Sequence, residues 1–281
     1  MILVADSGAT KCDWMHADKD KIGEKISTMG FSPFFHTEEL IADTINKTEP
    51  LVAVAKDIEK VFYYGTGCSS PDRKNKMQKA LQLVFKSANI EVDHDLNGAA
   101  IAACMGEPGI ACILGTGSNS CYYDGKDVYE EVPSLGHRLG DEGSGYHFGK
   151  QLIRLFLYKK LPDYLMDTLS NEYGLTKEKI FANVYGEGYV NTYLASFMKS
   201  LSNHNNEKWV KEFIYTGLSE FVNFHIKVFK NYDHVPVNFV GSVAYYFKHV
   251  LDDVAADNGF KIGRVIKQPI NNLVEFHQNT K

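Results

Sequence analysis

Two short turns rich in glycine and hydroxyl side chains stand out in this chain, Asp6-Ser7-Gly8-Ala9-Thr10-Lys11 and Gly115-Thr116-Gly117-Ser118-Asn119. Each follows a short apolar run and precedes another strand-like stretch. Glycine lets backbone amides approach an anion closely, and threonine or serine adds a hydroxyl donor. Neither turn fits the P-loop pattern or the dinucleotide-binding pattern. We therefore predict that the two turns, one from each half of the chain, hold the phosphates of a nucleotide from opposite sides.

A carboxylate that could act as a general base lies in the segment Val92-Asp93-His94-Asp95-Leu96-Asn97-Gly98, which we expect at the junction of a strand and a helix. A carboxylate of this segment, at the end of a strand, could accept the proton of a hydroxyl group as that hydroxyl attacks a phosphoryl group. The alternative is structural, because an aspartate before a helix commonly caps it and stabilises it by about 1 kcal/mol. Taken alone, the segment favours the cap.

The densest polar and glycine-rich segment runs from Ser134 to Gly145 and includes Asp141. Ordering several glycines costs backbone entropy, which suggests a loop that wraps a polar ligand such as a sugar. We expect a helix to start near Ser144, and an ordinary solvated loop before it is the alternative. Gly241-Ser242, at the end of an apolar run, could let an adenine ring lie against the backbone, or it could form a simple strand-to-helix corner.

The elements that position these segments follow from the apolar periodicity. In the first half we expect strands at residues 2–5, 12–17, 22–28, 61–64 and 90–94, and helices at 37–48, 72–88 and 97–105. In the second half we expect strands at 110–114, 118–123, 127–132, 235–240 and 261–266, and helices at 143–160, 189–202, 207–230 and 244–257. Each half thus runs from a three-stranded meander into alternating helices and strands. We predict an α/β protein with two domains, residues 1–107 and 108–281, divided at Pro108-Gly109.

Composition and charge exclude several classes of protein. The net charge of −5 and the lack of a basic run give no general attraction to nucleic acid or to an anionic membrane. The five cysteines form no C-x-x-C pair and favour reduced thiols over a disulfide framework or a zinc site. No apolar window approaches the length of a membrane span, and the first residues do not resemble a secretory signal. We therefore expect a cytoplasmic protein.

Taken in order, these segments resemble the superfamily of sugar kinases, heat-shock ATPases and actin. Within it they resemble the N-acetylglucosamine kinases and the wider BadF/BadG-type ATPase group, over the chain from Asp6 to Val250. The two turns match the phosphate motifs, and Asp95 matches the catalytic aspartate. The segment from Gly136 to Ser144 matches a loop typical of N-acetylglucosamine kinases. Phe239-Val240-Gly241-Ser242-Val243 matches the adenosine motif.

The resemblance implies two RNase H-like domains, each a mixed β-sheet flanked by helices, hinged around a cleft, with the C-terminal segment packing back on the first domain. It implies ATP and Mg²⁺, and transfer of a phosphoryl group to a hydroxyl, the 6-hydroxyl, of N-acetylglucosamine or a related amino sugar. Asp6 would hold the Mg²⁺ through water, and Asp95 would deprotonate the acceptor. Domain closure would exclude water, which competes as acceptor.

The ATP-binding residues implied by the resemblance are Gly8, Thr10, Lys11, Gly115, Thr116, Gly117, Ser118, Gly241 and Ser242. The implied sugar-binding residues are Ser32, Asp95, Asn119, Ser134, Leu135, Gly136 and Asp141. The implied partner is a small-molecule sugar, with neither nucleic acid nor membrane, and analogy suggests a homodimer.

One position departs from the family pattern. Relatives commonly place an asparagine after the third strand, whereas this chain has Ser32 there. A hydroxyl lacks the paired geometry of an amide, so the identity of the sugar stays open. Two alternative functions also stay open: an activator ATPase that shares an iron–sulfur cluster between subunits, and a non-catalytic sugar or nucleotide sensor. The presence of both Asp6 and Asp95 favours turnover.

Overall fold

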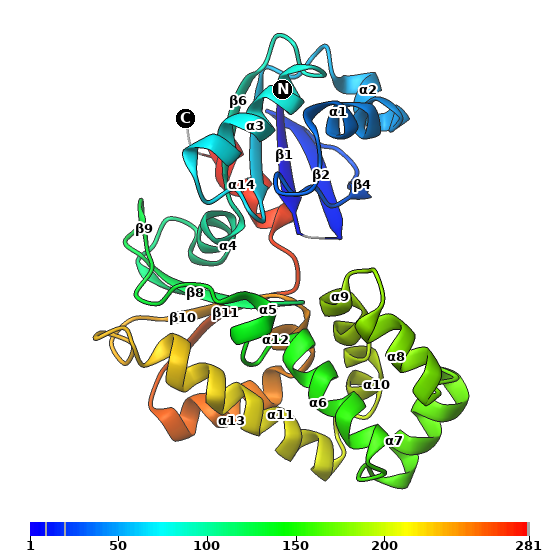
Figure 1. Ribbon diagram of the computed structural model, residues 1–281. Helices are drawn as coiled ribbons and strands as arrows, with labels where there is room; N and C mark the ends of the chain where they lie inside the picture. Colours follow the sequence, from blue (N-terminus) through cyan, green and yellow to red (C-terminus); the bar gives the residue numbers. More distant parts are fainter. Residues whose placement is uncertain (9, 20, 280–281) are drawn as a thin grey trace. The chain divides into compact units, whose positions relative to one another are not determined.

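The computed structural model describes residues 1–8, 10–19 and 21–279, and the chain divides into two compact units (Figure 1). The first unit contains residues 1–107 and the C-terminal segment that starts at Gln268. The second unit contains residues 108–267. None of the helices in the described ranges is long and apolar enough to cross a membrane.

The sheet of the first unit has the strand order β3-β2-β1-β5-β6, with β4 beside β2. Its strands are β1 (Ile2–Ser7), β2 (Lys11–Asp18), β3 (Lys21–Ile22), β4 (Ile26–Met29), β5 (Lys60–Gly65) and β6 (Asn89–His94). β1 pairs antiparallel with β2 and parallel with β5, and β5 pairs parallel with β6. The prediction of one strand over 22–28 is wrong. The Gly23 amide donates to the His16 carbonyl at 2.8 Å, and residues 23–25 turn out of the ladder between β3 and β4.

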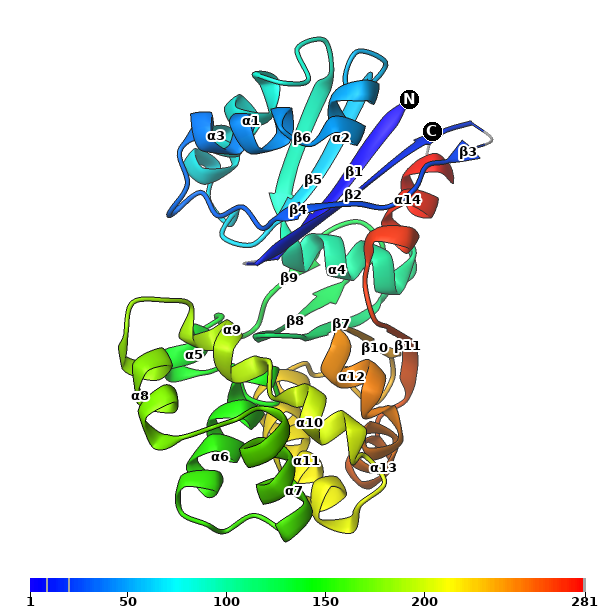
Figure 2. The ribbon, with the colours of Figure 1, turned by 90° about the vertical axis from the view of Figure 1, so that its right-hand side faces the viewer.

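Helices cover both faces of this sheet (Figure 2). They are α1 (Glu38–Asn46), α2 (Glu49–Val54), α3 (Pro71–Gln82), α4 (Asp95–Cys104) and α14 (Ile270–Asn279). Leu3, Trp14 and Tyr63 point from the sheet into a core shared with α1 and α3. α4 and α14 pack on each other and on the sheet, and the Asn272 side chain donates to the Ala102 carbonyl at 2.9 Å. The sequence predicted neither α2 nor α14.

The second unit repeats this topology, with the strand order β11-β10-β7-β8-β9. Its strands are β7 (Gly109–Leu114), β8 (Ser118–Tyr123), β9 (Val128–Tyr129), β10 (Val237–Val240) and β11 (Ile262–Ile266). β7 and β8 are antiparallel, whereas β10 pairs parallel with both β7 and β11. The predicted fold, two mixed sheets flanked by helices, is therefore confirmed.

The helices of the second unit are more numerous and shorter than predicted. They are α5 (Gly136–Leu139), α6 (Gly145–Leu157), α7 (Asp163–Asp167), α8 (Lys177–Tyr185), α9 (Val190–Ala195), α10 (Met198–Asn203), α11 (Lys208–Phe221), α12 (Ser242–Tyr246) and α13 (Lys248–Asn258). The predicted helices at 189–202 and 244–257 are each broken in two, near Phe197 and at Phe247. The helix predicted over 207–230 gives way after Phe221 to a π-helical turn, η2 (Val222–Ile226).

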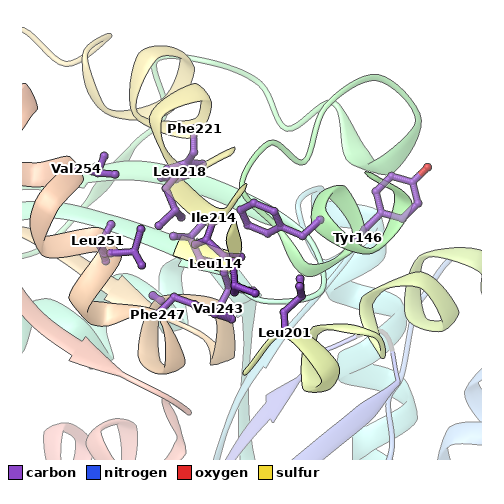
Figure 3. Packing of buried hydrophobic residues seen from close by; sticks show 14 of the residues in the cluster. Leu114, Tyr146, Leu201, Ile214, Leu218, Phe221, Val243, Phe247, Leu251 and Val254 are labelled. Carbon is purple, nitrogen blue, oxygen red and sulfur yellow. The ribbon is translucent and has the colours of Figure 1, made fainter. Parts of the chain in front are cut away.

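One apolar core holds these helices against the sheet. Leu114 at the end of β7 packs among Ile214 and Leu218 of α11 and Leu251 of α13, and all four are fully buried (Figure 3). Burying each such side chain contributes about 1.5–3 kcal/mol. Tyr146 of α6 lies at the edge of this cluster, with its hydroxyl turned away from it. The core therefore fixes the end of β7, from which the second glycine-rich turn begins.

Candidate active site

In the first unit, the predicted metal and catalytic carboxylates lie at one edge of the sheet. β1, β5 and β6 run parallel, and Asp6, Tyr64 and Asp93 form one row across them. Ser7, Gly65 and His94 form the next row, and Asp95 follows immediately. The carboxyl ends of parallel strands are where open α/β sheets bind ligands. The fold thus brings together two acidic residues that are far apart in the sequence.

Asp6 occupies an environment that disfavours its own negative charge. Burial raises the pKa of its carboxyl to about 7, with further increases from the charges of Asp95 and Asp13 and a decrease from Lys11. A cation beside Asp6 would offset these repulsions, so the residues present fit a Mg²⁺ ion. Among the described residues, no group of three or more His, Cys, Asp or Glu side chains could hold a metal. A Mg²⁺ ion at Asp6 would therefore need water and phosphate oxygens to complete its ligands.

Asp95 is the first residue of α4, and its side chain does not cap the helix. The N-cap is His94, which makes no side-chain capping bond. Asp93 serves the junction instead, because its carboxylate accepts from the His94 amide at 2.8 Å, the Asn97 side chain at 2.6 Å and the Lys74 ammonium at 2.5 Å. Asp95 lies 3.1 Å from His94 Nε2. The structural role expected of an aspartate in this segment thus belongs to Asp93, and the Asp95 carboxylate makes no capping bond.

The first glycine-rich turn connects β1 to β2. The Gly8 amide donates to the Lys11 carbonyl at 3.0 Å, and Gly8 and Thr10 are exposed, whereas Ala9 lies outside the described residues. The Lys11 ammonium lies 2.8 Å from the Asp13 carboxylate, which also accepts from the Ser27 hydroxyl at 2.7 Å. A phosphate that recruits Lys11 would have to compete with Asp13.

Ser32, the predicted sugar-binding residue of this unit, is buried in a turn. Its hydroxyl accepts from the Phe34 amide at 3.4 Å, and its amide donates to His36 Nδ1 at 3.2 Å. The turn is tied to β1, because the Phe31 amide donates to the Ser7 hydroxyl at 3.1 Å. Ser32 therefore shapes the turn through its local hydrogen bonds.

In the second unit, the second glycine-rich turn and the predicted adenosine motif meet. β7 and β10 are parallel neighbours, and a Cβ on Gly241 would lie 2.9 Å from the Gly115 nitrogen, so only glycine permits this approach. The first amides of α6 hold the turn, with Gly145 donating to the Gly115 carbonyl at 2.8 Å and Tyr146 donating to the Thr116 carbonyl at 3.0 Å. α6 begins at the N-cap Ser144, as predicted.

Ser118 and Asn119 begin β8 beside this turn and differ in their bonding. The Asn119 side-chain oxygen accepts from the Ser120 amide at 2.9 Å. The Ser118 hydroxyl is buried and has no hydrogen-bond partner among the described residues. An unpaired buried hydroxyl is costly, about 1–3 kcal/mol, so it indicates a missing partner. A phosphate oxygen held at the turn would supply one.

Asp141 lies against the same turn. Its Oδ1 accepts from the Ser118 amide at 3.2 Å, and its backbone takes a positive φ of 63°. Burial raises the pKa of the Asp141 carboxyl, and the Ser118 hydrogen bond and the His137 charge oppose that rise. Gly136 begins α5 in the same loop, whereas Ser134 and Leu135 are exposed. The structure thus brings Asp141 to the predicted phosphate turn and leaves Ser134 and Leu135 at the surface.

Sequence reasoning missed the contact that ties this loop to the helices. Glu142 Oε2 lies 3.4 Å from His225 Nε2, in the π-helical turn η2, and the Ser120 hydroxyl donates to the His225 carbonyl at 2.8 Å. No signal of local spacing could reveal a pair this far apart. It also missed a basic stripe on α6, for which the spacing of Lys150 and Arg154 was a signal.

No protein-family model matches the chain, and no curated protein matches it either. Solved structures do match over nearly its whole length. A provisionally named N-acetylglucosamine kinase of Porphyromonas gingivalis has a TM-score of 0.94 and 35% identity, covering 100% of this chain and 99% of its own. A provisionally named N-acetylglucosamine kinase of Chromobacterium violaceum has a TM-score of 0.62 and 13% identity, covering 98% of each chain. A ROK family glucokinase of Streptomyces griseus, in complex with glucose and AMPPNP, has a TM-score of 0.56 and 13% identity, covering 98% of this chain and 97% of its own.

The two mixed sheets, with glycine-rich turns at the ends of β1 and β7, define an actin-like ATPase fold of the sugar kinase class. Within that class, the chain belongs to the family of the Porphyromonas gingivalis protein, with which it shares 35% identity over its full length.

Proposed function

We propose that this protein is an ATP-dependent kinase that phosphorylates a hydroxyl, the 6-hydroxyl, of N-acetylglucosamine or a related amino sugar. The observation that carries the proposal is the state of Asp95. Its carboxylate lies at the carboxyl edge of a parallel sheet, beside the desolvated Asp6, and it makes no capping bond. The name of the Porphyromonas gingivalis relative supports the choice of sugar.

In the proposed reaction, Asp95 accepts the proton of the sugar hydroxyl as its oxygen attacks the γ-phosphorus of ATP. The new oxygen–phosphorus bond forms as the bond between the γ-phosphorus and the bridging oxygen breaks, and ADP leaves. His94 Nε2, 3.1 Å from Asp95, orients the carboxylate. When bound, Mg²⁺ would neutralise charge on the phosphates, and Asp6 would hold it through water.

The second unit would bind the nucleotide. The Gly115–Ser118 turn offers a buried hydroxyl without a partner in the described chain, and Gly241 presents bare backbone beside it. We propose that Ser118 and Thr116 contact phosphate oxygens and that Gly241-Ser242 meets the adenosine. In this proposal Asp141 holds the sugar, and its bond to the Ser118 amide links the two binding functions.

We also propose that the chain is a member of the BadF/BadG-type group. We do not propose the activator function for it. An iron–sulfur cluster shared between subunits needs thiolates at a surface, whereas all five cysteines are buried. Burial also raises the pKa of the Cys68 thiol to about 12, which disfavours the thiolate that binds metal. These observations count against the activator, and the presence of both Asp6 and Asp95 favours a kinase over a sensor.

The decisive experiment is a coupled assay of ADP release with Mg-ATP against N-acetylglucosamine, N-acetylmannosamine, glucosamine, glucose and N-acetylmuramic acid, with a control without sugar. We expect ADP release to require one of the amino sugars. Release that is independent of sugar, or no release with any of them, would refute the proposal. NMR of the product would test whether the phosphate is on the 6-hydroxyl.

A further inference from the structure

A hollow of about 210 Å³ in the second unit is lined by several basic side chains, and none of its lining residues belongs to the glycine-rich turn. α5 contributes His137 and Arg138, and α6 contributes His147, Lys150 and Arg154. None of the lining residues is acidic. The described chain around the hollow therefore presents positive charge from two different helices.

The geometry of α6 explains why these side chains converge. His147, Lys150 and Arg154 are separated by three and four positions, so they lie on one face of the helix. Lys150 and Arg154 are a like-charge pair at this spacing, which is mildly destabilising in a helix, whereas burial lowers the pKa of His147 and disfavours its charged form. Arg138 adds a further positive charge from α5. The Arg138, Lys150 and Arg154 side chains are exposed, so an anion from solution can reach all three.

The protein does not supply the compensating charge. Arg154 donates to the Gln151 side-chain oxygen, and the Lys150 ammonium lies 5.8 Å from the centre of the Tyr146 ring. Within the described ranges, Arg138, Lys150 and Arg154 form no ion pair with a carboxylate, whereas His147 lies 3.8 Å from Glu220. The chain has 35 acidic against 30 basic lysine and arginine residues, so carboxylates are not scarce.

Two rings also lie in the wall of the hollow, although Tyr146 is only 8% exposed. The rings of His137 and Tyr146 meet edge to face at 5.2 Å. The Tyr146 hydroxyl points away from the apolar core, as Figure 3 shows. A small organic group joined to an anion would therefore find both a charged and an aromatic contact. A hollow of about 210 Å³ suits a compact ligand better than a polymer.

We propose that this hollow is a binding site for a small phosphate monoester, separate from the nucleotide turn. Two guanidinium groups and an ammonium match the oxygens of a phosphate dianion, since arginine recognises phosphate through paired hydrogen bonds. The site shares its loop with Asp141, because residues from His137 to Gly140 form one wall. A ligand bound here contacts the loop that carries the Asp141 carboxylate.

The test is isothermal titration of the full chain with inorganic phosphate and with glucose 6-phosphate, in the absence and presence of saturating ADP. We expect both probes to bind, and binding to persist with ADP. The double variant Lys150→Gln, Arg154→Gln should weaken binding about tenfold or more, since hydrogen bonds to charged groups contribute about 1.5–3 kcal/mol. Arg138→Gln, on the other helix, should weaken it similarly.

Lys230→Gln is the matched control, because Lys230 is an exposed lysine of the same unit outside the hollow. It removes one positive charge and should leave binding unchanged. The proposal is overturned if neither probe binds at millimolar concentration, or if the double variant binds them as the wild type does. It is also overturned if Ser118→Ala, rather than the hollow variants, removes phosphate binding, since the anion would then lie at the glycine-rich turn. These outcomes are measured by binding and do not depend on kinase activity. The kinase proposal can therefore fail in the assay of ADP release without affecting this test.

Discussion

Gly98 of α4 lies so close to Tyr64 of β5 that a Cβ on Gly98 would be 2.8 Å from the Tyr64 Cβ. The helix that carries Asp95 at its first position therefore rests directly on the strand next to Asp6. A side chain at residue 98 would have to push the start of α4 away from the sheet. The position of the proposed base thus depends on the absence of a methyl group one turn further along.

Gly98→Ala should lower both stability and activity. Alanine gains about 1 kcal/mol of helix propensity over glycine, but overpacking costs about 1–3 kcal/mol. We expect a net loss of stability in thermal denaturation and a larger loss in kcat, because Asp95 moves. Gly188→Ala is the control, since a Cβ there meets nothing within 4 Å. A Gly98→Ala protein with wild-type stability and kcat would show that the contact does not position Asp95.

At the junction of β6 and α4, Asp95→Asn should mainly lower activity, whereas Asp93→Asn should mainly lower stability. Asp95→Asn removes the proposed base, so kcat should fall about 10²-fold or more while ATP binding stays within a few-fold. Asp93→Asn weakens the bonds to His94, Asn97 and Lys74. It should therefore lower the melting temperature more than Asp95→Asn does. Steady-state kinetics, ATP titration and thermal denaturation of both variants check this. Turnover by Asp95→Asn within a few-fold of wild type would refute the assignment.

Ser118→Ala should stabilise the free protein and weaken its hold on ATP. The substitution removes a buried hydroxyl without a partner in the described chain, which costs about 1–3 kcal/mol. A lost hydrogen bond to phosphate should raise the ATP dissociation constant about tenfold. Ser120→Ala, on the same strand, is the matched contrast. Its hydroxyl donates to the His225 carbonyl, so its loss should destabilise the protein and spare ATP binding. Equal ATP affinity in the Ser118 variant and the wild type would remove Ser118 from the nucleotide site.

Asp141→Asn should distinguish sugar binding from support of the turn. Asparagine tolerates the positive φ of 63° and keeps an oxygen to accept from the Ser118 amide, but it loses the charge. We expect the KM for the sugar to rise about tenfold or more and the KM for ATP to stay nearly constant. Asp141→Ala should raise both, because the turn also loses its support. If Asp141→Asn shifts the two KM values equally, Asp141 does not act on the sugar.

His277 of α14 should make stability fall in mild acid. Its ring stacks on Phe62 at 3.6 Å, Nε2 lies 2.8 Å from the Tyr64 hydroxyl, and burial lowers its pKa from 6.5 to about 4. The unfolded chain binds the proton more readily than the folded one between these values. The contribution of His277 to stability is therefore complete above pH 6.5 and declines as pH falls towards 4, by at most about 3 kcal/mol.

His277→Gln should remove this contribution, so that the unfolding free energy falls less, relative to the wild type, as the pH is lowered from 7 to 4. His234→Gln is the control, because the His234 side chain is 81% exposed. Urea unfolding at intervals between pH 4 and pH 7 would measure both variants. A slope in His277→Gln identical to that of the wild type would show that His277 is not the group responsible.

The sequence by itself determined the strands that end in the two glycine-rich turns and the repeated topology. Apolar runs bounded by glycine are local signals, so β1, β5, β7 and β8 are found within a residue or two of their predicted ranges. Only the tertiary structure showed that Asp93, rather than Asp95, bonds at the start of α4, because Asp93 is also held by Lys74 of α3, 19 residues away in the sequence.

Tertiary structure also decided which elements α14 packs against and which groups surround the Ser118 hydroxyl. α14 packs against strands from the other end of the chain, and no local pattern encodes a contact between Asn272 and Ala102. The Ser118 hydroxyl is buried without a partner in the described chain, next to an amide that donates to Asp141, 23 residues away. Periodicity specifies which face of an element is buried, whereas the partner that meets each polar atom is fixed by packing over long separations in the chain.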